Sequence, residues 1–266
     1  MIFAEDAAQA AAHAPATLVL TVVQNDADVS LDRFAGWLDG AELRIVRAWE
    51  GEPVPTDVAT LGAGLIVLGG HTNAHADDAA PWLPATRTLL AAAVAAQLPT
   101  LGICLGAQLL AVACGGRLQV AAPPGREAGI VRIHWRPQAA GDPVVGALAV
   151  AARTSGTATA VPSMHADAVV DLPPGAIWLG ASDMYPYQAF RVGSAWGVQF
   201  HPEASRATIR TWASSHDELD VTAVEAGYVA LEAEVAAAGR AVAAGFAAVC
   251  QSGSGTRSSA STIVYA

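Results

Sequence analysis

The chain has 266 residues, of which 53% are hydrophobic and 14% charged, a composition that excludes general disorder and allows one large or two small domains. The formal net charge is -10, and every basic residue is an arginine. Because an acidic surface repels phosphate backbones, we expect no nucleic-acid partner. The three cysteines (Cys104, Cys114 and Cys250) are too few for a disulfide framework and lack zinc-ligand spacing, which favours a reducing, cytoplasmic setting.

Two segments are candidates for targeting or membrane insertion. Residues 1–16 are interpreted as an N-terminal extension, and acidic Glu5 and Asp6 stand where a signal peptide has basic residues. The stretch between Arg87 and Arg117 has no charge and is long enough to span a bilayer. Pro99 would break a helix in its middle, so we interpret this stretch as helix, strand and helix inside an α/β core and expect no membrane association.

Apolar runs of strand length alternate with helical stretches in the first half of the chain. Strands are predicted over 17–23, 43–48, 64–68 and 98–103. One helix is expected to begin at Ser30 as its N-cap and to carry Phe34 and Trp37 on its apolar face, and a second covers 85–96. Because the strands are continuously apolar, they predict an open, mostly parallel sheet with helices on both faces, the flavodoxin-like α/β class.

The pattern changes after Arg117. Strand-like pieces at 130–135, 176–179, 188–192 and 195–200 are separated by Gly and Pro turns, which predicts an antiparallel excursion within the same domain. The main domain is therefore placed at 17–215.

The C-terminal segment predicts one long helix over 216–250. Apolar residues from Val221 to Val249 recur at steps of three and four. Because Gly227, Gly239 and Gly245 weaken an isolated coiled coil, we favour a helix packed on its own domain over a dimer or partner seam. Residues 251–266 are Ser/Gly-rich at their start and are expected to form a flexible tail.

The strongest local signal is the segment 102–108, G-I-C-L-G-A-Q, which follows an apolar strand and opens a helix. Glycines two residues either side of Cys104 allow a sharp strand-to-helix turn that exposes the sulfur, as in a nucleophile elbow. A helix N-terminus favours the reactive thiolate. The alternative, a structural cysteine in the core, suits Cys114 and Cys250 better, because flanking glycines serve no packing purpose.

A second signal, 197–203 (G-V-Q-F-H-P-E), supplies a base and a group to orient it. His201 and Glu203 lie two residues apart on an extended segment and point the same way, and Pro202 disfavours helix at His201. Glu203 can then fix the imidazole while its other nitrogen faces Cys104. A third, weaker signal is Gly69-Gly70 after a strand, where the Gly70 amide could join the Leu105 amide in an oxyanion hole.

Together these motifs resemble the class I (triad) glutamine amidotransferases, in particular their free-standing, GMP-synthase-like glutaminase domains, over about 17–211. The resemblance implies Cys104 as nucleophile, His201 as base and Glu203 as orienter, with Gly70 and Leu105 amides as the oxyanion hole. Gln108 resembles the substrate-glutamine contact. The segment Met164, His165, Ala166 and Asp167 resembles the family's S-H-x-D segment, whose backbone grips the glutamine α-amino and α-carboxylate groups. Two departures are His71 in place of Pro and Met164 in place of Ser.

The implied reaction is hydrolysis of the glutamine side-chain amide through a γ-glutamyl thioester, with no metal or organic cofactor. No G-x-x-x-x-G-K-[ST] or S-G-G-x-D-S loop is present to activate an acceptor, so the resemblance implies that ammonia goes to a separate synthetase subunit. A γ-glutamyl hydrolase or peptidase with the same triad is the alternative. A non-catalytic binding or regulatory protein on this fold is disfavoured by the intact Cys104, His201 and Glu203. His165 and Asp167 are interpreted as ordering the substrate loop rather than as a second acid–base pair.

Overall fold

The structure, a computed structural model, describes residues 17–259, and for 254–259 only the backbone. The predicted N-terminal extension (1–16) and residues 260–266 of the predicted tail lie outside the described residues.

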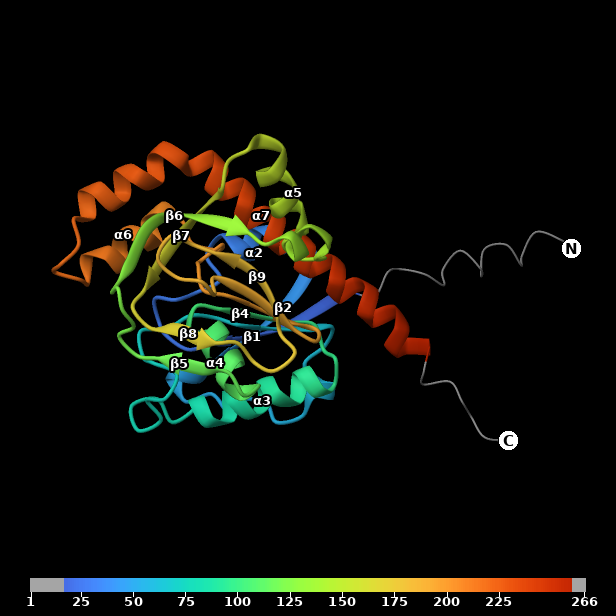
Figure 1. Ribbon diagram of the computed structural model, residues 1–266. Coiled ribbons are helices and arrows are strands. Elements are labelled where there is room, and N and C mark those ends of the chain that lie inside the picture. The colour runs from blue at the N-terminus through green and yellow to red at the C-terminus, as the bar shows by residue number, and fades with distance from the viewer. Residues whose placement is uncertain (1–16, 260–266) are drawn as a thin grey trace, which may run out of the picture.

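A nine-stranded sheet forms the centre of the molecule, in the order β2-β1-β3-β4-β11-β10-β9-β6-β7 (Figure 1). The strands of this sheet are β1 (Leu18–Gln24), β2 (Ala41–Arg47), β3 (Gly64–Val67), β4 (Thr100–Ile103), β6 (Glu127–Trp135), β7 (Thr159–His165), β9 (Ile177–Ala181), β10 (Ala189–Val192) and β11 (Ala195–Val198). A separate two-stranded ribbon pairs β5 (Arg117–Gln119) with β8 (Ala168–Asp171).

The sheet has a parallel half and an antiparallel half, as the sequence predicted. Strands β2, β1, β3, β4 and β11 are parallel neighbours. From β11 onward, β10, β9, β6 and β7 pair antiparallel. The two halves join where β11 pairs with β4, and the sequence segments predicted to carry the chemistry follow these two strands.

Helices cover both faces of the sheet. They are α2 (Arg33–Trp37), α3 (Leu83–Ala95), α4 (Leu105–Ala113), α5 (Gly146–Ser155), α6 (Arg206–Ser214) and α7 (Val221–Ser259), with short 3-10 turns η1 (Ala48–Glu50), η2 (Val58–Thr60) and η3 (Pro137–Gly141). Leu65 and Val67 of β3 belong to the hydrophobic cluster that includes α3 and α4, whereas Ile66 belongs to the cluster on the other face, which includes α2, α5 and α7. This alternation explains why the strand is apolar at every position. The uncharged stretch between Arg87 and Arg117 is the end of α3, β4 and α4, not a membrane helix.

The predicted N-cap of the first helix was wrong. The helix begins at Arg33 after Asp32, and Ser30 Oγ accepts a hydrogen bond only from the Asp32 amide, at 3.3 Å. Asp32 itself accepts hydrogen bonds from Ser205 N–H (2.6 Å) and the Thr208 hydroxyl (2.5 Å) at the start of α6. The apolar face is as expected, because Phe34 is fully buried. Tertiary contacts to α6 therefore decide where this short helix starts.

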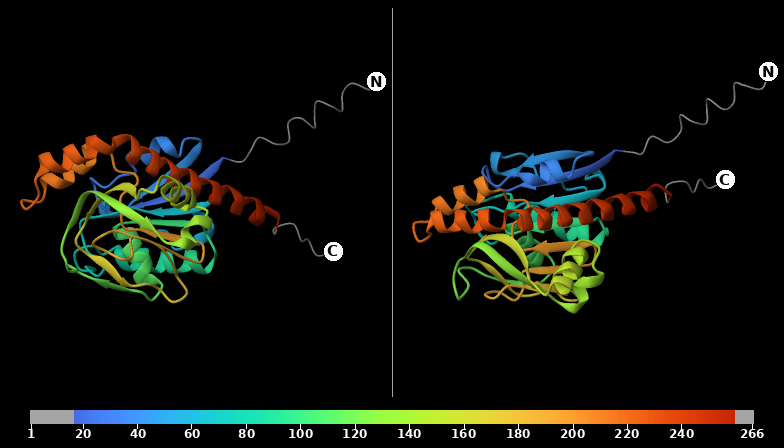
Figure 2. Two further views of the ribbon diagram at one scale, coloured as in Figure 1. Left: turned by 45° about the horizontal axis from the view of Figure 1, so that its top comes forward. Right: turned by 90° about the horizontal axis from the view of Figure 1, so that it is seen from above.

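The long C-terminal helix α7 lies across the face formed by α2, β6 and β7, and its C-terminal end extends past the body of the domain (Figure 2). Its inward positions Tyr228, Val235, Val242 and Phe246 are buried in the core. The helix is kinked at Leu231, where φ is -124° and ψ is 15°, and then continues to Ser259, so residues 251–259 of the predicted tail are helical. A helix already formed adds turns at little nucleation cost, which offsets the weak propensity of Gly and Ser.

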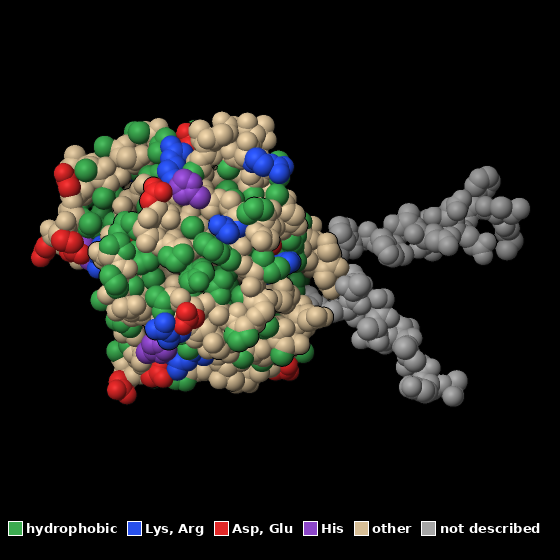
Figure 3. Space-filling view, in the orientation of Figure 1, with side chains coloured by type: hydrophobic (Ala, Val, Ile, Leu, Met, Phe, Trp, Pro, Cys, Tyr) green, Lys and Arg blue, Asp and Glu red, His purple; other side chains and the backbone are tan. Residues whose placement is uncertain are grey.

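Residues 221–253 of α7 are also long and apolar enough to cross a membrane by length and composition alone. In its most apolar stretch, 39% of the residues are buried inside the domain. The face shown in Figure 3 has hydrophobic side chains in its middle, whereas arginine and acidic side chains lie mostly toward its rim.

The glycines of the elbow are required by close backbone contacts. A Cβ on Gly106 would lie 2.0 Å from the Val67 carbonyl oxygen, and one on Gly102 would lie 2.5 Å from the Gly106 carbonyl oxygen. Helix α4 therefore packs directly on β3 and β4 without intervening side chains.

We expect Gly106→Ala to lower the free energy of unfolding by about 3 kcal/mol or more, because the contact is with rigid backbone. Gly36→Ala in α2 is the matched control, since its Cβ meets nothing within 4 Å. Denaturant unfolding of both variants checks this, and equal stability of the two would contradict the contact.

Candidate active site

The topology brings Cys104 and His201 to the same edge of the sheet. Cys104 directly follows β4, and His201 lies three residues after the end of β11, the parallel neighbour of β4. The Cys104 N–H donates to the Val198 carbonyl oxygen at 2.8 Å, and the His201 N–H donates to that of Pro162 at 2.8 Å. The carboxyl ends of parallel strands are where open α/β sheets place their ligands.

Cys104 adopts the strained geometry of a nucleophile elbow. Its φ of 51° and ψ of -106° are unusual for a residue with a side chain, and it precedes the first residue of α4. Such strain is retained where the surrounding structure enforces it, commonly at functional sites. The side chain is 5% exposed, so the sulfur lies in a largely dry environment.

His201 is held between Glu203 and Cys104. Its Nδ1 lies 2.7 Å from Glu203 Oε1, and its imidazole lies beside the Cys104 side chain, since both border the same face of Gly69. Burial lowers the pKa of His201, but the neighbouring Glu203 and Cys104 side chains outweigh it and raise the pKa to about 10. Gly69 allows this approach, because a Cβ there would lie 3.0 Å from the imidazole Cε1 and 3.5 Å from the Cys104 Cβ.

The Cys104 sulfur also contacts two groups that the sequence did not single out for this purpose. Gln199 Nε2 donates to Sγ at 3.5 Å, and Sγ lies 3.9 Å from the Met164 carbonyl oxygen. An amide donor stabilises negative charge on sulfur. Gln199 stands two residues before His201 on the same extended segment, and this spacing was the one signal for it.

A pocket of about 190 Å³ opens beside the sulfur. It is lined by Gly70, His71, Thr72, Cys104, Gln108, Arg126, Met164, His165, Ala166, Asp167 and His216. Every predicted substrate contact therefore lies at one cavity. Arg126, whose Nε donates to Glu218 at 2.9 Å, was not predicted from the sequence.

The two predicted oxyanion groups are neighbours. The Leu105 side chain lies 2.8 Å from where a Gly70 Cβ would stand. Within the described part of the chain, neither the Gly70 amide nor the Leu105 amide donates to another backbone carbonyl. The oxyanion hole formed by these two amides stays a prediction.

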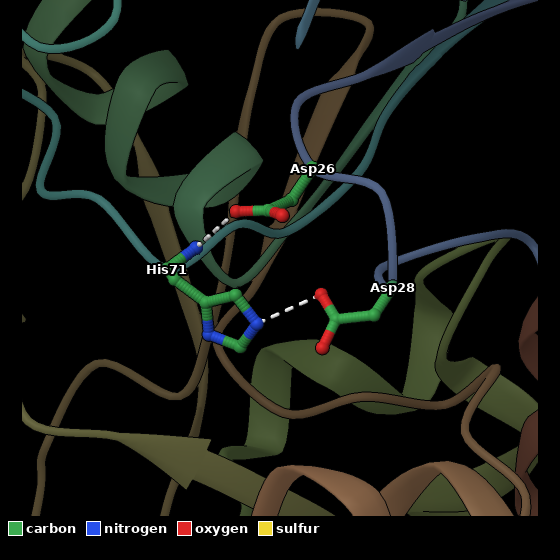
Figure 4. A group of neighbouring side chains, drawn as sticks. All are labelled: Asp26, Asp28 and His71. Carbon is green, nitrogen blue, oxygen red and sulfur yellow. Dashed lines mark hydrogen bonds and ion pairs between the residues drawn. The ribbon is translucent and has the colours of Figure 1, made fainter. Parts of the chain in front are cut away.

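His71, which replaces the family's Pro, is tied to the loop after β1 (Figure 4). Its N–H donates to Asp26 Oδ2 at 3.2 Å, and its Nε2 lies 2.8 Å from Asp28 Oδ1. These three residues place one ligand atom each within 4.8 Å of one another, as a cation site requires. The two hydrogen bonds explain why these three side chains lie together. They also fix the turn that carries Gly70.

Gln108 connects the elbow helix to the substrate segment. Its Nε2 donates to the Asp167 carbonyl oxygen at 3.1 Å and to Gln199 Oε1 at 3.2 Å. Because both amide hydrogens are engaged, Oε1 is the group available to a substrate at the pocket wall.

His165 and Asp167 form no acid–base pair, in line with the interpretation that they order the substrate loop. His165 Nδ1 lies 3.0 Å from the Asp167 backbone oxygen, not from its carboxylate. Asp167 Oδ1 accepts from the Ala121 N–H at 2.8 Å.

Helix α7 packs against the backbone of the segment that carries His201 and Glu203. Tyr228 donates its hydroxyl to the Ala204 carbonyl oxygen at 2.9 Å. A Cβ on Gly239 would lie 2.2 Å from the Pro202 carbonyl oxygen, between the two candidate catalytic residues.

We therefore expect Gly239→Ala to displace this segment, lower Cys104-dependent turnover and cost about 1–3 kcal/mol of stability. Gly227→Ala in the same helix meets nothing within 4 Å and should instead stabilise by up to about 1 kcal/mol. Turnover and denaturant unfolding of both variants check this, and equal turnover would contradict the role of the contact.

Comparison with known proteins gives the family of the chain. The model of the family "Glutamine amidotransferase class-I" matches residues 40–211. A glutamine-hydrolyzing GMP synthase subunit of Halobacterium salinarum is 33% identical over 172 residues, covering 62% of this chain and 82% of that protein. The GMP synthase of Thermomicrobium roseum is 36% identical over 149 residues, which cover 55% of this chain but only 24% of the relative. A glutamine amidotransferase structure from Thermotoga maritima matches with a TM-score of 0.74 at 20% identity, covering 87% of this chain and 98% of that one.

The fold and the family match define a class I glutamine amidotransferase, and the chain belongs to that family. Within the family it is GMP-synthase-like, with the glutaminase subunits of GMP synthases among its homologues.

Proposed function

We propose that this protein hydrolyses the side-chain amide of glutamine through Cys104, His201 and Glu203 and supplies the ammonia to a separate acceptor enzyme. The observation that carries the proposal is that Cys104 meets the His201–Glu203 pair beside a pocket lined by the substrate-binding candidates.

The residues support a two-step displacement. With its pKa raised to about 10, His201 is protonated at neutral pH and pairs with the Cys104 thiolate. The sulfur attacks the glutamine amide carbon, and the amides of Gly70 and Leu105 receive the charge that develops on its oxygen. His201 gives its proton to the leaving nitrogen as the carbon–nitrogen bond breaks, which leaves a γ-glutamyl thioester and ammonia.

Hydrolysis of the thioester restores the enzyme. His201, now neutral, takes a proton from water as the water oxygen attacks the thioester carbon. The carbon–sulfur bond breaks, glutamate leaves, and the proton remains on His201 opposite the thiolate. The cycle uses only groups of this chain and one water.

The pocket favours glutamine over a larger γ-glutamyl compound. Its volume of about 190 Å³ is well below the roughly 300–1,000 Å³ typical of sites for drug-sized ligands. Arg126 provides a positive charge at the same wall for the substrate α-carboxylate.

The acceptor is proposed to be a separate synthetase. The Halobacterium relative is named as one subunit of a GMP synthase, and the likeness to it extends over 82% of its length. By contrast the chain spans only about a quarter of the Thermomicrobium synthase.

Release of ammonia and glutamate tests the proposal. We expect the purified protein to hydrolyse glutamine, to act poorly on γ-glutamyl peptides, and to lose both activities in Cys104→Ala. Turnover of γ-glutamyl peptides without turnover of glutamine would instead establish a γ-glutamyl hydrolase. A protein with no Cys104-dependent turnover, alone or with a synthetase subunit, would be the non-catalytic alternative.

A further inference from the structure

A buried carboxylate lies beneath the substrate segment, outside the candidate triad. Glu127, at the start of β6, is 2% exposed, and no arginine pairs with it among the described residues. Its carboxylate accepts from Gln188 Nε2 at 2.6 Å, from Ser163 Oγ at 3.3 Å and from the Ser182 hydroxyl, and it lies 3.1 Å from His165 Nε2. Burying a carboxylate is costly unless it is hydrogen-bonded, and a buried network whose members are hydrogen-bonded in this way makes its surroundings rigid.

The hydrogen bonds of His165 show what Glu127 contributes. His165 Nδ1 faces the Asp167 carbonyl oxygen, which can only accept, so Nδ1 carries a proton. Nε2 lies 3.1 Å from Glu127 Oε2 and 3.3 Å from Gln188 Nε2, which itself donates to Glu127. His165 is therefore held at both of its ring nitrogens.

The Asp167 carbonyl oxygen is where this network reaches the pocket. It accepts from His165 Nδ1 and from Gln108 Nε2 of the elbow helix. The neighbouring Ala166 carbonyl accepts from the Ala122 N–H at 2.9 Å, and the Met164 carbonyl lies beside the Cys104 sulfur. Segment 164–167 lines the pocket, and the hydrogen bonds of His165 and Glu127 fix its backbone.

We propose that Glu127 is a positioning residue for the γ-glutamyl substrate: through His165 it holds the backbone of segment 164–167 in the conformation that binds the amino-acid head. This inference rests on the proposed function, because it assigns that segment to substrate binding. Glu127 acts through His165 and does not itself touch the reacting atoms.

Glu127→Gln tests this with little change of shape. A carboxylate accepts at both oxygens, from Ser182 at Oε1 and from Gln188 and Ser163 at Oε2, whereas an amide has one oxygen and one NH2 group. The variant therefore loses the accepted hydrogen bonds on one side, and with them part of the network that holds His165 Nε2. His165→Gln breaks the same link from the other side, because one amide cannot span both partners.

The experiment measures alkylation of Cys104 by two reagents. One is the diazoketone analogue of glutamine, 6-diazo-5-oxo-L-norleucine, which needs the amino-acid site, and the other is iodoacetamide, which has no amino-acid head. For Glu127→Gln and His165→Gln we expect the half-saturating concentration of the diazoketone to rise about tenfold or more, the loss of one to two hydrogen bonds to a charged or buried group. The iodoacetamide rate and the maximal diazoketone rate should stay within about twofold. The double variant should show no further increase. Glu42→Gln, in an exposed pair with Arg44 on β2, is the control and should match the wild type.

Each outcome is decisive. Unchanged half-saturation in either single variant, or an equal loss of iodoacetamide reactivity, would overturn the role of Glu127 while leaving the glutaminase proposal intact. If iodoacetamide labels wild-type Cys104 but the diazoketone does not saturate, the amino-acid site itself is refuted, and both proposals fall together. Should Glu127→Gln fail to fold, His165→Gln gives the same test.

Discussion

Cys104→Ser is expected to lower glutamine hydrolysis by about 10⁴-fold or more while the protein stays folded. A serine fits the space of the buried thiol and keeps the backbone turn at φ 51°. Its hydroxyl, however, is a far weaker acid than a thiol, so no anionic nucleophile forms beside His201. The nucleophile is lost although the pocket is retained.

The measurement is steady-state release of glutamate, with binding of glutamine followed separately. We expect glutamine affinity to change little, because the wall formed by Gln108 and the 164–167 segment is unaltered. Turnover within about tenfold of the wild type would show that Cys104 is not the nucleophile.

We expect Glu203→Gln to lower turnover of glutamine by about 10²- to 10⁴-fold, the second largest effect. The variant keeps the shape of the side chain but removes the charge that lies 2.7 Å from His201 Nδ1. Because Glu203 is fully buried, no solvent replaces that charge. The His201 imidazolium then becomes less stable, and the thiolate loses its partner.

The same substitution has a consequence for stability. The pKa of folded His201 is raised from 6.5 to about 10, so the protonated pair stabilises the fold fully below about pH 6.5, and this contribution is lost as the pH rises toward 10. We therefore expect the stability difference between wild type and Glu203→Gln to be largest near pH 6 and to shrink by pH 10. Denaturant unfolding across this range checks the sign, and a difference that does not depend on pH would contradict the pairing of His201 with Glu203.

The parts of the candidate site that could be predicted from the sequence are those made of residues close together in the chain. The elbow around Cys104 and the His201–Glu203 spacing are local patterns, and parallel pairing of β4 with β11 places them together. The antiparallel half was harder to predict. Strand β7 contains Pro162, which argues against a strand, but β7 lies at the edge of the sheet, where the missing N–H costs nothing.

Helices α5 and α6 were not predicted, although α6 carries a usable signal. Ser205 is its N-cap and accepts from the Thr208 N–H at 3.3 Å. The segment is short and follows the His201–Glu203 motif directly, so it shows no long apolar periodicity that would predict a helix.

The site residues that were not predicted from the sequence are held in place by contacts between segments far apart in the chain. Glu127 is 38 residues from His165 and 61 from Gln188 along the chain, and no local motif predicts that β6, β7 and the loop before β10 bring them together. One signal was present, since Arg126 and Glu127 place two charged residues at the start of β6, before the apolar run that follows. A charged residue at a buried strand position indicates either a partner or a functional group.

Trapping the acyl-enzyme tests the central claim most directly. The protein is mixed with glutamine labelled in its carbon chain, quenched in acid within the first turnover and digested, and the label is located by peptide mapping. We predict a base-labile γ-glutamyl adduct on the peptide that carries Cys104, and we predict that Cys104→Ser lacks it. Conditions that slow hydrolysis of the thioester should lengthen the lifetime of this adduct. Label on another peptide, or glutamate formed without any adduct on Cys104, would contradict the proposed thioester mechanism.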